Sequence, residues 1–229
     1  MTGISADPYW WQAAPPQDFH IDSWPERADV VIIGGGYTGF GAAIPLARAG
    51  LDVVILERDQ IGSGASTRNG GITSGNLRLS FDDLAKRFGA DKATAFYQEA
   101  KAARADLAQF IISEKIDCDL QQCGRLVGAL RQESLDSMKR DADRLTKLFD
   151  IDATVYDRAS LPDYIDTSRY CGGMMRDDIG GIHPAKLLAG MCKIARAASV
   201  KIATQTKVVA VSQQSTSSPT AEFRVETSR

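Results

Sequence analysis

The chain has 229 residues, 44% of them hydrophobic, and its 27 lysines and arginines nearly balance its 29 aspartates and glutamates. This length suits one large domain or two modest ones with a hydrophobic core. The even charge, without a basic run, argues against nucleic acid as a partner. No apolar stretch reaches membrane-spanning length, and the N-terminus lacks the basic and apolar regions of a signal peptide. We therefore expect a cytoplasmic protein with no membrane partner.

The cysteines argue against a metal site. Cys118, Cys123, Cys171 and Cys192 lack metal-ligand spacing, and the chain has only two histidines to assist them. We expect reduced thiols in a cytosolic protein and no bound metal.

Residues 1–27 form a proline-rich arm before the first predicted strand. Its aromatic residues are Tyr9, Trp10, Trp11 and Trp24. Aromatic side chains in a polar arm are expected to anchor it to the body of the protein, and a contact with a ligand or partner is the alternative.

Two apolar runs enclose a helical pattern between residues 28 and 57. The runs Val30–Ile33 and Val53–Leu56 are continuous, which is typical of strands buried on both faces. The small residues between them predict a helix that stops at Gly50. Pro45 removes one hydrogen bond inside this helix, so we expect a bend there. The order matches a βαβ nucleotide-binding unit.

The turn after the first run reads G-x-G-x-x-G at Gly34, Gly36 and Gly39. Gly34 permits the tight turn, Gly36 lets the backbone approach a pyrophosphate, and Gly39 lets the helix pack close to the strand. The N-terminus of the helix attracts the phosphate charge. Glu57 ends the second run, where its carboxylate can accept hydrogen bonds from a ribose diol and would repel the 2′-phosphate of NADP. These features together predict a dinucleotide site, whereas the glycines alone would fit an ordinary turn.

A glycine-rich segment, residues 58–76, follows the second strand. It leaves the strand on the side where such sheets bind ligands. Its glycines let backbone N–H groups approach a planar ring or a phosphate, and Arg68 adds a positive charge. A flexible loop is the alternative.

Two motifs in this region carry a resemblance to a known family. V-V-I-I-G-G-G-Y-T-G, together with L-E-R-D-Q-I-G-S-G-A-S-T-R-N-G-G, resembles the N-terminal half of the FAD-dependent amine and amino-acid oxidases. This superfamily includes D-amino-acid oxidase, glycine oxidase and sarcosine oxidase. The G-A-S-x-R-N-G-G form, after an arm with paired aromatics, is similar to its gamma-glutamylputrescine oxidoreductase branch.

The resemblance implies FAD as cofactor and a set of contacts to it. The residues implied at the ADP half are Gly34, Gly36, Gly39 and Glu57, with the backbone of Val208 on the adenine. Those implied along the pyrophosphate and flavin are Ser66, Arg68, Asn69, Gly70 and Gly71.

The expected fold is α/β, with a Rossmann-like FAD-binding domain of the glutathione reductase type. Residues 28–79 and 172–229 are expected to form this domain, and residues 80–171 part of an inserted α+β domain on the substrate side. The last strand pattern runs into the final residues. We therefore expect an incomplete architecture, from a truncated gene product or a fragment.

The inserted region begins with helical patterns. Residues 82–88 form a short amphipathic helix, and Asp91 can cap a longer one. Lys101, Arg104 and Glu114 are expected on its solvated face. Its expected apolar side comprises Ala95, Phe96, Ala100, Ala103, Leu107, Phe110 and Ile111.

Further elements follow as far as residue 171. Residues 118–130 predict two short strands broken near Gly124, and residues 153–156 predict another strand. Residues 134–149 predict a helix, whose expected apolar side comprises Leu135, Met138, Ala142, Leu145 and Leu148.

The last part returns to nucleotide-binding elements. Residues 172–184 end in a glycine turn before a helix over 184–198. His183 is expected to serve at the start of this helix, and an acid/base role near the flavin is the alternative. The remaining expected strands cover residues 199–203, 206–211 and 222–227.

The resemblance implies oxidation of a C–N bond in an amine or amino acid. A hydride from the α-carbon would pass to the flavin, the imine would hydrolyse, and oxygen would be reduced to peroxide. Arg68 is the residue expected to stabilise negative charge on the reduced ring. The alternatives are a non-catalytic flavin-binding module and an FAD dehydrogenase that uses a quinone or another acceptor.

Overall fold

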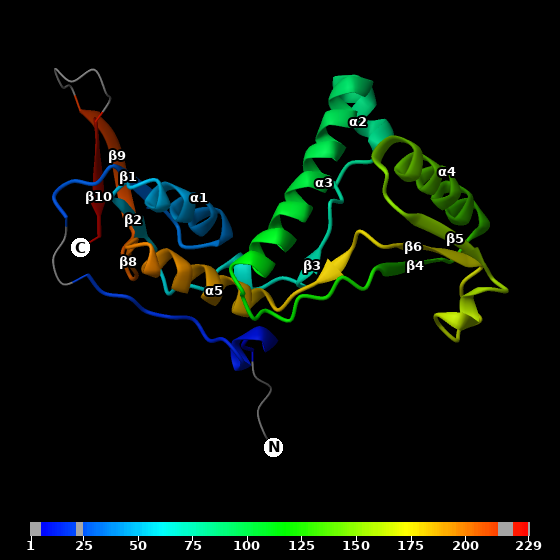
Figure 1. Ribbon diagram of the computed structural model, residues 1–229, viewed down its shortest axis with the longest axis horizontal. Coiled ribbons are helices and arrows are strands. Elements are labelled where there is room, and N and C mark those ends of the chain that lie inside the picture. The colour runs from blue at the N-terminus through cyan, green and yellow to red at the C-terminus, as the bar shows by residue number, and fades with distance from the viewer. Residues whose placement is uncertain (1–5, 22–24, 215–221, 229) are drawn as a thin grey trace. The chain divides into compact units, whose positions relative to one another are not determined.

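A computed structural model describes residues 6–21, 25–214 and 222–228. The chain forms two compact units, and Figure 1 labels most of their helices and strands. The first unit contains Met1–Gly70, Glu114–Cys118 and His183–Arg229, and the second contains Gly71–Ser113 and Asp119–Ile182.

A parallel sheet forms the centre of the first unit. Its strands are β1 (Val30–Ile33), β2 (Val53–Leu56) and β8 (Lys201–Ala203), in the order β1-β2-β8. Helix α1 (Tyr37–Arg48) connects β1 to β2, and α5 (Pro184–Ala197) leads into β8 and packs beside α1. All four residues of β2 are buried, as expected for a central strand. The predicted βαβ unit is therefore confirmed.

Strand β1 differs from its prediction. Val31 is 37% exposed and Ile33 is 60% exposed, so the strand is not buried on both faces. Within the described residues β1 pairs only with β2, as an edge strand. Val31 and Ile33 pair with Val54 and Leu56 of β2. Val208 and Val225, from a hairpin of the last two strands, cover the two β2 residues and leave Val31 and Ile33 exposed.

Helix α1 continues through Pro45 and ends at Arg48, as its pattern predicted. The bend expected at Pro45 stays a prediction. Gly50, where the pattern stops, has a φ of 90°. This left-handed conformation favours glycine and ends the helix.

The covering hairpin consists of β9 (Val208–Gln214) and β10 (Glu222–Thr227), which pair antiparallel. Val208 and Val225 pack on the core formed by Val54, Leu56 and Ala203. The strand predicted over residues 206–211 is therefore β9, which starts later, at Val208, and extends further, to Gln214.

The N-terminal arm is attached to the first unit. It contains a short 3₁₀ helix, η1 (Tyr9–Gln12), and Gln17 pairs with Ile61 through backbone hydrogen bonds of 2.9 Å. The N–H of Thr204 donates to the carbonyl of Phe19 at 3.0 Å. The prediction that the arm is anchored to the body of the protein is confirmed for its described residues. Trp24, also part of that prediction, lies outside the described part of the chain.

The second unit contains an antiparallel sheet with β6 (Gly172–Arg176) between β4 (Arg125–Ala129) and β5 (Ala153–Asp157). Sequence patterns did not predict β6. Its glycines hide the strand pattern, but they are needed because a Cβ at Gly172 would lie 2.7 Å from the side chain of Leu135. A 3₁₀ helix, η3 (Leu161–Asp163), follows β5.

A smaller sheet in the same unit pairs β3 (Ile72–Thr73) with β7 (Gly180–Gly181). Of the two strands predicted over 118–130, the second is β4, and the first is reduced to a single bridge between Gln121 and Gly181. The break lies at Gly124, whose φ of 74° favours glycine.

These pairings move the predicted domain boundaries. Residues 172–182, expected in the FAD-binding domain, belong to the second unit because β6 and β7 pair there, and residues 71–79 join them through β3. Residues 114–118, expected in the inserted domain, belong to the first unit. Two hydrogen bonds of Arg48 to Glu114 and one from the N–H of His183 to the carbonyl of Cys118 hold them there.

The helices of the second unit are α2 (Phe81–Phe88), α3 (Ala90–Ser113) and α4 (Gln132–Phe149). Ser80 caps α2 by accepting a hydrogen bond from the N–H of Asp83 at 3.1 Å. Helix α3 begins at Ala90, so Asp91 lies in its first turn instead of at its cap. In α4, Phe149 is buried and the predicted Leu148 is 51% exposed.

The inward side of α3 was predicted in part. Ala100, Leu107, Phe110 and Ile111 are buried or half-buried as expected, whereas Ala95, Phe96 and Ala103 are exposed. The prediction missed Ala93, Tyr97 and Arg104, which also lie on the inward side. The three charged residues assigned to a solvated face have other positions. Lys101 donates to the carbonyls of Phe149 and Asp150, Glu114 pairs with Arg48, and Arg104 lies on the inward side.

Candidate functional site

The turn between β1 and α1 has the geometry that its three glycines predicted. Gly34 has a φ of 103°, and its N–H donates to the carbonyl of Leu56 at 2.8 Å. A Cβ on Gly39 would lie 2.1 Å from the carbonyl oxygen of Gly34, so the first turn of α1 packs directly on the strand end. Gly36 is the N-cap of α1 and provides no side-chain cap.

The amides at the start of α1 face a hydroxyl group. The N–H of Tyr37 donates to Oγ of Ser66 at 3.1 Å, and a Cβ on Gly36 would lie 2.9 Å from the same oxygen. A helix N-terminus with a glycine cap and a hydroxyl beside it can bind an anion through backbone N–H groups and the helix dipole. The arrangement fits the diphosphate of a dinucleotide.

Glu57 closes the other side of this turn. Its carboxylate accepts hydrogen bonds from the N–H of Gly35 at 2.8 Å and from the N–H of Asp59 at 2.9 Å. Its backbone pairs with Ala203 and Thr206, each at 2.8 Å. Each carboxylate oxygen has lone pairs beyond the one used here, so Glu57 can still accept hydrogen bonds from a diol.

Val208 lies two residues beyond Thr206, at the start of β9. Its backbone pairs in register with Thr227, next to a shift in the ladder after Glu226. Contact between Val208 and an adenine stays a prediction.

The loop that follows β2 is ordered by its own hydrogen bonds. It contains a 3₁₀ turn, η2 (Ala65–Thr67). Asn69 Nδ2 donates to the carbonyls of Ala65 and Ser66 at 3.1 and 3.0 Å. The structure therefore brings Ser66 and Asn69 together near the start of α1.

Arg68 is held at the surface of the same loop. Its Nε donates to the carbonyl of Ser63 at 2.8 Å, and its guanidinium lies 4.6 Å from the ring centre of Trp11. Gly70 has open space where a side chain would extend. Gly71 begins the second unit, with a φ of 70° and a carbonyl that accepts from the N–H of Ile182 at 2.8 Å.

Two tryptophans of the arm support this loop. Trp10 Nε1 donates to the carbonyl of Asn69 at 2.7 Å, and Trp11 Nε1 donates to the hydroxyl of Thr67 at 2.9 Å. The sequence predicted that the arm is anchored, but not which part of the protein its aromatic residues contact. The paired aromatics were the available signal, and the loop they contact lies more than fifty residues along the chain.

His183 has the structural role that its position before Pro184 favoured. It is the N-cap of α5, where Nδ1 accepts a hydrogen bond from the N–H of Lys186 at 3.2 Å. Its ring is buried and lies edge-on to Trp10, with 4.9 Å between the ring centres.

Tyr37 is a residue of this region that sequence reasoning missed. Its hydroxyl donates to the carbonyl of Pro184 at 2.8 Å, which joins the first turn of α1 to that of α5. Burial raises the pKa of Tyr37, so the hydroxyl stays a protonated donor. Its position within G-x-G-x-x-G accepts any residue, so the motif gave no signal for it.

Neither a membrane-spanning helix nor a metal-binding cluster is found in the part of the chain that the structure describes. None of its helices combines the length and apolar character needed to cross a membrane. No three His, Cys, Asp or Glu residues there are grouped to hold a metal ion.

Comparison with known proteins adds a family and a fold. The family model described as "DAO: FAD dependent oxidoreductase" matches residues 29–228. Gamma-glutamylputrescine oxidoreductase of Escherichia coli (strain K12) is 32% identical over 162 residues, which cover 71% of this chain and 38% of that protein. Probable oxidoreductase OrdL of Rhizobium meliloti (strain 1021) is 30% identical over 218 residues, or 92% of this chain and 50% of that protein.

Among solved structures, glycine oxidase from Geobacillus kaustophilus aligns with a TM-score of 0.71 at 21% identity. The alignment covers 89% of this chain and 52% of that one, and it supports the α/β fold. The chain thus spans about half the length, or less, of the proteins it matches.

Proposed function

Because the chain belongs to the DAO family of FAD-dependent oxidoreductases, we propose that it forms the FAD-binding part of an enzyme that oxidises the C–N bond of a small amine or amino acid. The observation that carries the proposal is the turn from Gly34 to Gly39, with the start of α1 between the carboxylate of Glu57 and the hydroxyl of Ser66.

Each side of this arrangement suits one part of the cofactor. Gly34, Gly36 and Gly39 with the first amides of α1 would hold the diphosphate, and Glu57 would accept hydrogen bonds from the adenosine ribose. Val208 would contact the adenine through its backbone. The residues proposed along the pyrophosphate and flavin are Ser66, Arg68, Asn69, Gly70 and Gly71.

The chain's contribution to the reaction would be position and electrostatics. When bound, FAD supplies the redox chemistry by accepting the electrons of the C–N bond. Trp11 and the carbonyl of Ser63 hold the guanidinium of Arg68 in one place, which supports its proposed role in stabilising negative charge. His183 would support the loop through Trp10 and hold the start of α5.

The substrate and the electron acceptor are the finer part of the proposal. A relative that shares 32% of aligned residues acts, by its name, on gamma-glutamylputrescine, which supports an amine of this kind as substrate. We propose oxygen as the acceptor, with release of peroxide. We also propose a cytoplasmic location, which the four free cysteines support.

Absorbance of the purified protein tests the cofactor site. We expect a yellow protein with a flavin spectrum, and a weaker flavin affinity in Glu57→Ala. Asp59→Ala is the matched control, because it removes a neighbouring carboxylate but keeps the backbone N–H that donates a hydrogen bond to the carboxylate of Glu57. A colourless wild-type protein that takes up no FAD would contradict the proposed site, as would equal flavin affinities of the two variants.

Substrate assays on flavin-loaded protein test the reaction. We expect flavin bleaching under anaerobic conditions with one of gamma-glutamylputrescine, putrescine, sarcosine or a D-amino acid, and peroxide release in air. Bleaching without peroxide would identify a dehydrogenase with another acceptor. A yellow protein inert to all four would favour a flavin-binding module over an oxidase.

A further inference from the structure

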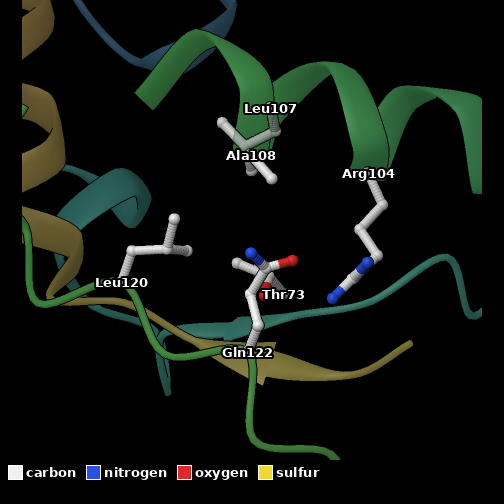
Figure 2. A pocket seen from close by; sticks show the side chains of 6 residues that line it. All are labelled: Thr73, Arg104, Leu107, Ala108, Leu120 and Gln122. Atoms are coloured by element: carbon white, nitrogen blue, oxygen red, sulfur yellow. The ribbon is translucent and has the colours of Figure 1, made fainter. Parts of the chain in front are cut away.

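The pocket shown in Figure 2 is a small hollow of the second unit. It lies between α3 and the segments that carry Thr73 and Gln122, and Arg104 lines it from the helix. The space has room for about one water molecule. It therefore admits neither a substrate nor a cofactor.

The described part of the N-terminal arm, in the first unit, contacts both ends of the loop that follows β2. At the start of the loop, Gln17 and Ile61 exchange two backbone hydrogen bonds of 2.9 Å. At its end, the two tryptophans of η1 donate to the hydroxyl of Thr67 and to the carbonyl of Asn69. The arm and the loop belong to the same compact unit. One segment thus holds the loop at two places.

Trp11 contacts the buried part of this loop. Thr67 is buried, and its hydroxyl accepts a hydrogen bond from Trp11 Nε1 at 2.9 Å and donates one to the carbonyl of Gly62. The next residue, Arg68, has its guanidinium 4.6 Å from the ring centre of Trp11. A buried hydroxyl needs its partners, and a ring face attracts a guanidinium. Trp11 therefore restrains both the backbone before Arg68 and the end of its side chain.

Trp10 is connected to the start of α1 through a series of hydrogen bonds. Its Nε1 donates to the carbonyl of Asn69 at 2.7 Å, and Asn69 Nδ2 donates to the carbonyl of Ser66 at 3.0 Å. Oγ of Ser66 in turn accepts from the N–H of Tyr37 at 3.1 Å. The arm thus acts on the group of amides and hydroxyls proposed to hold the diphosphate.

We propose that the arm holds the loop after β2 in the arrangement that binds FAD, with Trp10 and Trp11 as positioning residues. Ordering a glycine-rich segment costs conformational entropy, and a loop that is already held loses less of it when the cofactor binds. By linkage, FAD stabilises the attached arm to the same degree as the attached arm favours FAD. This inference rests on the proposed function, because FAD is the ligand that it couples to the arm.

The dissociation constant of FAD, measured by flavin fluorescence on the purified chain, tests this role. Trp11→Phe keeps a ring beside the guanidinium and removes the N–H that donates to the hydroxyl of Thr67. Trp10→Phe likewise removes its N–H and keeps a ring. Tyr9→Phe is the matched control, because it also removes one polar group from an aromatic residue of η1, at a position that is 71% exposed.

We expect each tryptophan variant to weaken FAD binding by about 3- to 10-fold, which corresponds to the loss of one hydrogen bond. Tyr9→Phe should change it by less than about 2-fold. Trp11→Leu also removes the ring beside Arg68, so it should in addition lower the reduction potential of the bound flavin. A tenfold weaker stabilisation of the reduced ring corresponds to about 30 mV for a two-electron couple.

Hydrogen exchange measures the same coupling from the side of the arm. The N–H groups of Gln17 and Phe19 are bonded to the carbonyl of Ile61 at 2.9 Å and to the hydroxyl of Thr204 at 2.8 Å, so their exchange reports release of the arm. FAD should slow this exchange in the wild type by at least about 3-fold, and by less in the tryptophan variants. The wild-type measurement decides even if a substitution unfolds the protein.

The outcomes separate this inference from the proposed function. If the tryptophan variants bind FAD as the wild type does, or if FAD leaves exchange of the arm unchanged, the arm is only an anchor and the inference is wrong, although a yellow wild type would still support the cofactor site. If the wild type takes up no FAD, both fail together. If FAD binding depends on the tryptophans but no amine bleaches the flavin, the role of the arm stands and the proposed reaction fails.

Discussion

A single methyl group added at Gly39 tests whether close packing of α1 on the strand end holds the nucleotide turn. Gly39 lies in the first turn of α1 and is absent from the residues with positive φ, so alanine can adopt its backbone conformation. The added Cβ, however, would lie 2.1 Å from the carbonyl oxygen of Gly34, where ordinary contact begins at 3.4 Å. The helix must therefore move away from the strand by about an ångström.

Two opposing effects decide whether Gly39→Ala raises or lowers the free energy of unfolding. Alanine in place of glycine favours a helix by about 1 kcal/mol. Overpacking against the backbone costs about 1–3 kcal/mol or more, and the movement also weakens the hydrogen bond of Gly34 to Leu56 by about 1 kcal/mol. We expect Gly39→Ala to lower the free energy of unfolding by about 1–3 kcal/mol and to weaken FAD binding, because the turn no longer has its wild-type shape.

Gly41→Ala in the same helix is the matched control. Nothing lies within 4 Å of its ideal Cβ, and the position is exposed, so only the helix preference acts and the variant should gain about 0.5–1 kcal/mol. Urea unfolding followed by circular dichroism, with flavin titration of each variant, measures both effects. If Gly39→Ala were as stable as Gly41→Ala and bound FAD as the wild type does, close packing at this turn would not matter and the reasoning would be refuted.

Three further predictions concern other contacts of the first unit. His183→Ala should lower the free energy of unfolding by about 1 kcal/mol through loss of the α5 cap, and His183→Asn should restore much of it in the same urea assay; equal losses would rule out the cap. Arg48 lowers the pKa of Glu114, so this pair contributes stability above the ordinary carboxyl pKa of 4.5 and loses it as the pH falls through the lower folded value. The stability difference between wild type and Arg48→Met should therefore be present at neutral pH and vanish in acid, and a difference independent of pH would contradict this. Burial raises the pKa of Cys192 to about 11, so a thiol reagent near neutral pH should modify the exposed Cys123 quickly and Cys192 only after unfolding, as peptide mapping would show.

The candidate site could be predicted from the sequence wherever its geometry is local. The positive φ of Gly34, the side-chain-free cap at Gly36 and the close approach at Gly39 follow from chain geometry over a few residues. For the same reason the βαβ order placed Glu57 at the end of β2, beside the turn. His183 before Pro184 likewise predicted the start of α5.

Contacts between distant segments could not be predicted in this way. The periodicity of α3 identified a helix and part of its buried side, but not the rest, because each side carries apolar residues. Burial of Ala93 and Tyr97 turned Arg104 inward and left Phe96 exposed. Trp10 and Trp11 similarly required a loop far along the chain as their partner.

The sequence by itself determined the family, the order of the nucleotide-binding elements and the backbone conformations of the glycine turn, because each depends on neighbours within one or two turns of chain. Only the tertiary structure decided that β1 is an exposed edge, that β6 is the centre of the second sheet and that Arg104 lines a pocket. The physical reason is that a hydrophobic pattern records which residues share a face. The strand or helix that covers that face is selected by packing and hydrogen bonds between segments far apart in the sequence.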